Sequence, residues 1–166
     1  MKNKAKAVTI VLTAIYFLMV VWIILFKLSA LSEIKHLDHI RDINLIPFHY
    51  HEEQSYHLTE VLENVMIFIP LGIYFKMLKI SGKKVILFGM LFSLGLEILQ
   101  LALAVGVTDI TDIITNTAGT AIGVGIYALL ARFFGKREKL DTVLRISASV
   151  CTILFISFMA LLLSVN

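Results

Sequence analysis

Acidic and amide side chains inside apolar segments are the residues of this 166-residue chain best suited to chemistry. Asn64 lies in one apolar segment and Glu97 in a second, while Asp109, Asp112 and Asn116 lie in a third. A charge at the middle of a membrane-spanning helix costs about 2.5–3.5 kcal/mol, so such groups face the protein interior, protonated or partnered. The sequence therefore predicts a polar site built by several segments. Its candidate ligand-binding residues are Arg41, Asn44, Glu63, Asn64, Glu97, Gln100, Asp109, Asp112 and Asn116.

The segments that must position these residues are long and apolar. The chain is 58% hydrophobic and 16% charged, with a mean hydropathy of +0.88, whereas soluble domains are about 45–50% apolar and about 25% charged. At about 1.5 Å of rise per residue, a helix of about 20 residues crosses the hydrocarbon core of a bilayer. The composition predicts an all-α, polytopic membrane helical bundle with five transmembrane helices, and it excludes a soluble enzyme or a nucleic-acid-binding module. The five segments are roughly 7–26, 62–79, 85–104, 110–134 and 144–165.

The basic residues predict the orientation of the bundle. Twelve of the fifteen lysines and arginines lie at the N-terminus, between the second and third segments, or between the fourth and fifth. Since basic loops face the cytoplasm, we expect the N-terminus inside and the C-terminus outside. The first segment is expected to stay as an uncleaved anchor, because its apolar stretch is longer than the roughly 7–15 residues of a signal-peptide core.

The depth of the polar residues also agrees between segments. From the helical rise, Glu97 and Asn116 lie roughly 10 Å below the outer edge of the membrane, and Asn64 lies roughly 8 Å below it. Three helices are thus expected to bring polar groups together in the outer half of the bilayer. No basic residue lies between Lys84 and Arg132, so the hairpin of the third and fourth segments is expected to turn over on the outside.

Small residues predict close helix packing. Gly119 and Gly123 continue the polar stripe of the fourth segment and form a small-xxx-small pattern, which lets two helices approach closely. We expect the third segment to be the partner. In the second segment, Pro70 and Gly72 are expected to kink the helix, because proline lacks the backbone N–H that the helix needs.

The acids have two further interpretations. Asp109 and Asp112 can be the N-cap and first-turn acid of a helix that begins outside. Glu97 does not fit that role, since it lies near the C-terminal end of its helix, where the helix dipole disfavours an anion. Alternatively, Glu97, Asp109 and Asp112 can hold a divalent cation.

The connection between the first two segments holds all five histidines and a short apolar stretch, 44–48, that contains Pro47. The apolar stretch is expected to dip into the interface or to cap the bundle, because irregular backbone at membrane depth must be shielded by protein. The histidines can bind zinc, but such a site usually needs four ordered ligands, so exposed polar histidines are the favoured interpretation. They are His36, His39, His49, His51 and His57.

Taken in order along the chain, these elements resemble the VanZ-like family of bacterial membrane proteins. The resemblance implies a family core over about 41–134 within a single membrane domain of residues 1–166, in a multi-pass protein of the bacterial cell membrane. Apart from Arg145, the stretch 144–165 has only small polar groups, and it is expected to be a peripheral fifth helix. The family pattern also has an arginine three residues before Asp109, where this chain has Gly106, so an expected countercharge is missing. The matching elements are Arg41 with 44–48; Asn64, Phe68, Pro70, Leu71 and Gly72; Glu97 and Gln100; and Asp109, Asp112, Asn116, Thr117, Gly119 and Gly123.

The resemblance also implies a function. The founding member of the family is associated with low-level resistance to teicoplanin, a lipoglycopeptide, so a role in the cell envelope or in glycopeptide resistance is expected. Acids and amides at the lipid boundary suit an amphipathic partner: a membrane lipid, a lipid-linked cell-wall precursor or a lipoglycopeptide. The favoured interpretation is a binding protein of the outer leaflet. The alternative is a metal-assisted enzyme acting on a lipid headgroup, with the cation bridging carboxylate and phosphate. Nucleic acid is not expected as a partner.

The predicted orientation can be tested with a reporter that is active only outside the cytoplasm. Fused after Asn166 it should be active, and fused at Gly82 it should be inactive, because basic connections stay in the cytoplasm. The reverse pattern would contradict the outward placement of the acidic site.

Overall fold

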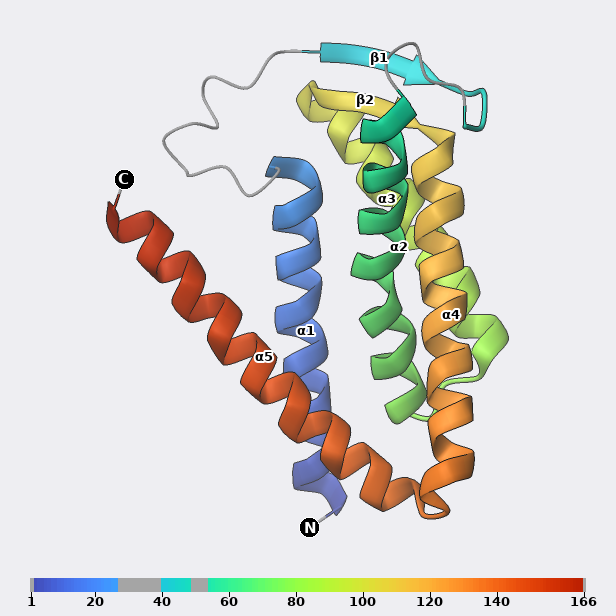
Figure 1. Cartoon of the computed structure of the whole chain (residues 1–166), viewed down its shortest axis with the longest axis vertical. Helices are drawn as coiled ribbons and strands as arrows, with labels where there is room; N and C mark the ends of the chain where they lie inside the picture. The colour runs from blue at the N-terminus through green and yellow to red at the C-terminus, as the bar shows by residue number, and fades with distance from the viewer. Residues whose placement is uncertain (1, 27–39, 49–53, 166) are drawn as a thin grey trace. The chain divides into compact units, whose positions relative to one another are not determined.

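The computed structural model describes residues 2–26, 40–48 and 54–165. Within these residues, five helices and two short strands follow one another along the chain (Figure 1). All five helices are long and apolar enough to span a membrane. This confirms the predicted all-α membrane protein with five spans, while the orientation of its termini stays a prediction. The elements are α1 (Lys2–Phe26), β1 (Ile40–Asn44), α2 (Gln54–Met77), α3 (Gly82–Leu103), β2 (Val105–Asp109), α4 (Ile110–Phe134) and α5 (Arg137–Val165).

The helices extend beyond several of the apolar segments. The fourth predicted segment has the bounds of α4, but α1 begins at Lys2, α2 at Gln54 and α5 at Arg137. A helix that satisfies its own backbone hydrogen bonds can continue past the hydrocarbon core with polar residues. As a result, Arg137, Lys139 and Arg145 lie on the first turns of α5 rather than in a loop.

The described chain divides into two compact units. One comprises Asp38–Tyr127 and contains β1, α2, α3, β2 and most of α4, and the other comprises Met1–Leu37 with Ala128–Asn166 and contains α1 and α5. The expected single membrane domain and the peripheral position of the fifth helix stay predictions.

The two strands form a parallel pair, which the sequence analysis did not anticipate. The register runs from Ile40 opposite Val105 to Asn44 opposite Asp109. β2 occupies almost all of the connection between the third and fourth segments, and the expected position of this hairpin on the outside stays a prediction. Parallel strands need a long crossover, and the antiparallel helices α2 and α3 provide it (Figure 1).

The glycines of α4 pack against α2. A Cβ atom added at Gly119 would overlap the carbonyl oxygen of Val65, and one added at Gly123 would overlap that of Ile69. Across the same contact, a Cβ atom at Gly72 would overlap the Thr120 carbonyl oxygen. The expectation that the third segment is the partner of this stripe is wrong, since the backbone contacts all come from α2. The helix α2 continues through Pro70, next to this contact.

Helix α3 contacts the other two helices through side chains. Gly89 lies against the side chain of Thr120 on α4. Phe88 of α3 packs on Phe75 of α2 with ring centroids 4.9 Å apart, and Phe92 packs on Phe68 at 5.9 Å. The three helices thus form one compact group, with backbone contact between α2 and α4 and aromatic contact between α2 and α3.

The glycine contact predicts a difference between two substitutions on the same helix. Gly123→Ala should lower the thermal unfolding midpoint in detergent, because its methyl group meets the α2 backbone and overpacking costs about 1–3 kcal/mol. Gly125→Ala should leave the midpoint unchanged or raise it, since no atom lies within 4 Å of the added Cβ and alanine favours the helix. Equal midpoints for the two variants would contradict the packing.

Candidate functional site

The polar site lies where α3 ends and α4 begins. Ala104 adopts the left-handed conformation (φ 56°, ψ 42°) and its backbone N–H donates to the carbonyl oxygens of Gln100 and Leu101, which ends α3. The chain then enters β2 directly, and β2 leads into α4 without an intervening loop. This short connection brings the last turns of α3 against the first turn of α4, and β1 lies beside β2 at the same place (Figure 1).

Glu97 accepts a hydrogen bond from the backbone N–H of Asp109 at 2.9 Å. Its side chain is buried, with 1% of its surface exposed. Asp109 in turn caps α4, since its Oδ1 accepts the N–H of Thr111 at 2.7 Å. In a capping box, the N-cap side chain bonds a backbone N–H inside the helix, and an acid at the third helical position bonds the N-cap N–H. Here the acid that bonds the N-cap N–H is Glu97, which comes from α3 rather than from α4 itself.

Asp112 holds the third helical position of α4 and bonds across to α2 instead. The Asn64 side-chain amide donates to Asp112 Oδ1 at 2.7 Å. The same kind of bond joins β1 to the site, because the Asn44 amide donates to Asp109 Oδ2 at 3.0 Å. Asn44, Asn64, Glu97, Asp109 and Asp112 therefore form one network from β1, α2, α3 and the start of α4, and we name it the carboxylate–amide cluster.

A second polar layer lies one turn deeper. The Asn116 amide donates to Ser93 Oγ at 2.9 Å, which links α4 to α3. Asn116 is 2% exposed, and its Oδ1 has no hydrogen-bond partner among the described residues. Asn116 therefore joins the helices in their interior, beneath the carboxylate–amide cluster.

The residues after β1 cap the start of α4. The backbone N–H of Phe48 donates to Thr111 Oγ1 at 3.1 Å. Four apolar side chains here are more than half exposed, which gives the site an apolar border that we name the β1 patch. It consists of Ile43 (51% exposed), Leu45 (69%), Ile46 (60%) and Phe48 (55%).

The remaining candidates lie at the edge of the site or outside it. Gln100 is buried, with its side-chain amide toward Gly106. Glu63 is exposed and makes no hydrogen bond to the cluster among the described residues. Arg41 lies opposite Gly106 in the strand register, and its side chain is outside the described part of the chain. The side chains of all five histidines, including that of His57 at the start of α2, also lie outside the described part of the chain.

The alternative in which Glu97, Asp109 and Asp112 hold a divalent cation gains no support from the described residues. Among the described residues, no group of three histidine, cysteine or acidic side chains gathers closely enough to hold a metal ion. Both carboxylate oxygens of Asp109 already accept hydrogen bonds, one from Thr111 and one from Asn44. The N-cap interpretation of Asp109 is confirmed instead.

Two threonines contribute to the site but were not predicted from the sequence. Thr111 bonds both Asp109 and Phe48, and Thr108 donates from its Oγ1 to the Glu97 carbonyl oxygen at 3.3 Å. The spacing Asp109-x-Thr111 is compatible with an N-cap, but threonine is too common for this to identify the contact with β1. The partner of Glu97 was missed because it is a backbone N–H, which every residue except proline has.

Comparisons with known proteins agree with the earlier resemblance. A sequence model of the VanZ/LLP1 family matches residues 13–135. "Protein VanZ" of Enterococcus faecium is 36% identical over 140 residues, which cover 80% of this chain and 81% of that protein. No solved structure shows a significant match. The match spans well over half of the chain and includes the whole carboxylate–amide cluster, and the chain therefore belongs to the VanZ/LLP1 family of membrane proteins.

Proposed function

We propose that this protein binds an amphipathic ligand at the outer face of the bacterial cell membrane and thereby contributes to teicoplanin resistance. The observation that carries the proposal is the position of the carboxylate–amide cluster directly beside the exposed β1 patch. Family membership supports the general role in the envelope and in resistance. A lipid-linked cell-wall precursor and a lipoglycopeptide both have the required combination of an apolar tail and a polar head.

Burial separates the residues that can touch a ligand from those that position them. Asn44, Asn64, Asp109 and Asp112 are half-buried. Glu97 and Asn116, at 1% and 2% exposed, lie beneath them. A ligand head therefore meets Asp109, Asp112 and the two amides, while Glu97 acts as a positioning residue through the N–H of Asp109.

The charges of the cluster favour a particular kind of head. Asp109, Asp112 and Glu60 add like charge near Glu97, so the site attracts groups that donate hydrogen bonds, such as ammonium, amide and hydroxyl groups. A bare phosphate would be repelled. The alternative, a metal-assisted enzyme, receives less support because Asp109 uses both oxygens for hydrogen bonds within the protein.

The contact role of Asp112 can be tested by removing only its charge. Asp112→Asn keeps an acceptor for the Asn64 amide, so the protein should fold, but a hydrogen bond to a charged group is worth about 1.5–3 kcal/mol and ligand affinity should fall roughly tenfold or more. Teicoplanin protection of cells with matched membrane levels of protein should therefore be lost. Glu63→Gln removes the same charge at an exposed position of α2 and should keep protection. Full protection by Asp112→Asn would contradict the proposal.

The positioning role of Glu97 predicts a split between two substitutions. Glu97→Gln retains an oxygen that can accept the Asp109 N–H, so stability and protection should both persist. Glu97→Leu leaves that buried N–H unpaired, which costs about 1–3 kcal/mol, and should lower both the unfolding midpoint and protection. If the glutamine variant folds normally but loses protection, Glu97 contacts the ligand through its charge and the assignment as a positioning residue is wrong.

A further inference from the structure

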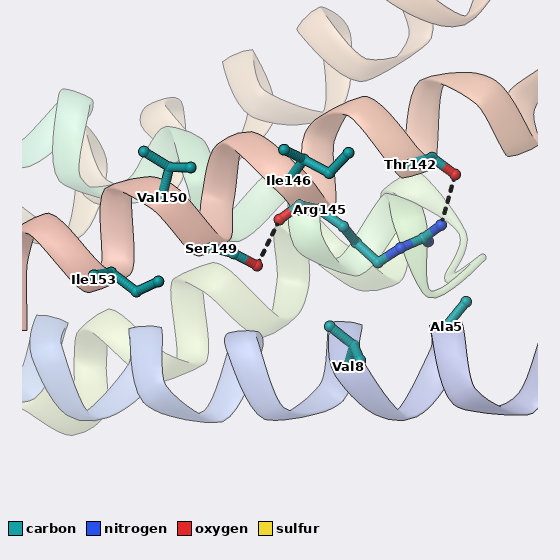
Figure 2. Close-up of a pocket in the computed structure, with 8 residues that line it drawn as sticks. All are labelled: Ala5, Val8, Thr142, Arg145, Ile146, Ser149, Val150 and Ile153. Atoms are coloured by element: carbon teal, nitrogen blue, oxygen red, sulfur yellow. Dashed lines mark hydrogen bonds between the residues drawn. The ribbon is translucent and has the colours of Figure 1, made fainter.

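A groove runs between the N-terminal halves of α1 and α5 (Figure 2). It encloses about 340 Å³, which is at the lower end of the roughly 300–1,000 Å³ of small-molecule sites. Ala5 and Val8 of α1 form one wall, and Ile146, Val150 and Ile153 of α5 form the other. Both walls belong to the same compact unit. None of its lining residues belongs to the carboxylate–amide cluster.

The walls of the groove are suited to an acyl chain. Val8 is 46% exposed, and Ile146, Val150 and Ile153 are between 51% and 63% exposed. Both helices are long and apolar enough to span a membrane, so these exposed side chains are suited to contact with hydrocarbon. An open apolar groove between two such helices is the shape that a lipid tail fills.

Arg145 lies at one end of the groove. It is eight residues after the start of α5, roughly 12 Å along the helix axis. Its Nη2 donates to the neutral Thr142 Oγ1 at 2.9 Å (Figure 2). An arginine within a membrane span is costly unless it reaches the interface or finds an anion.

Other charges at this end of the unit are mainly basic. Lys4 and Lys6 flank Ala5 on α1 and are exposed, as are Arg137 and Lys139 on α5. The acids of the same turns, Glu138 and Asp141, already take part in interactions within the protein. Basic pockets between membrane helices are characteristic binding sites for anionic lipid headgroups, for which the guanidinium group is a strong, directional partner.

We propose that the α1–α5 groove binds an anionic phospholipid of the leaflet at the N-terminal ends of these two helices. The phosphate is held by Arg145, with Lys4 and Lys6 adding positive charge, and one acyl chain lies between Val8 and Val150. The lipid thereby supplies an anionic partner for Arg145 and fills the space between α1 and α5.

The proposal can be tested by native mass spectrometry of the full-length protein in detergent, titrated with dioleoyl phosphatidylglycerol or dioleoyl phosphatidylcholine. The anionic lipid should bind about tenfold more tightly, and Arg145→Gln should remove that preference. Val150→Trp should weaken both lipids, because the indole ring occupies the groove. Lys83→Gln, which removes an exposed positive charge from the other unit, should change neither affinity.

Three results would overturn the proposal. The first is equal binding of the two lipids to the unmodified protein, and the second is an equal loss of preference in Lys83→Gln and Arg145→Gln, which would indicate unspecific charge attraction. The third is unchanged phosphatidylglycerol binding by Val150→Trp, which would place the lipid elsewhere. This third result decides the question if Arg145→Gln does not fold. Normal lipid preference in Arg145→Lys together with its loss in Arg145→Gln would support the role of the charge.

Discussion

The hydrogen bond from the Asp109 backbone N–H to the Glu97 carboxylate is the contact on which the rest of the polar site depends. Asp109 is both the last residue of β2 and the N-cap of α4, so one bond fixes the end of a strand and the start of a helix. Glu97 belongs to the C-terminal part of α3, but its carboxyl group bonds the backbone N–H at the start of α4. The short αL connection at Ala104 is what makes this contact between two helices possible.

The network above this contact depends in turn on close backbone packing. Asn64 precedes Val65, whose carbonyl oxygen touches Gly119 of α4. Because no side chain separates the two helices there, the short Asn64 side chain can reach Asp112, at 2.7 Å. A larger residue at Gly119 would separate α2 from α4 and break the bond without touching either partner. The glycines therefore matter for the site as well as for stability, although they bind nothing themselves.

The sequence was sufficient to predict the helices and the polar residues inside them. It was not sufficient to predict which of those residues pair with one another. The bounds of α4 and the shared face of its acids and glycines follow from apolar length and helical spacing. The stripe of Gly119 and Gly123 shows that a helix packs closely, but glycine has no side chain that could identify the partner as α2. The β1–β2 pair joins residues 65 positions apart, such as Asn44 and Asp109, and backbone pairing at that distance leaves no local pattern.

The hydrogen-bond partners of the carboxylates bear on the proposed function. Their hydrogen-bond partners in this structure include two side-chain amides and two backbone N–H groups. Amide partners hold a carboxylate in place without cancelling its charge, whereas an ion pair with lysine or arginine would neutralise it. Asp109 and Asp112 are half-buried and therefore remain partly available from outside, while the β1 patch beside them is apolar and exposed. The proposed ligand matches this surface, because it combines hydrogen-bond donors for the carboxylates with a hydrophobic tail for the β1 patch.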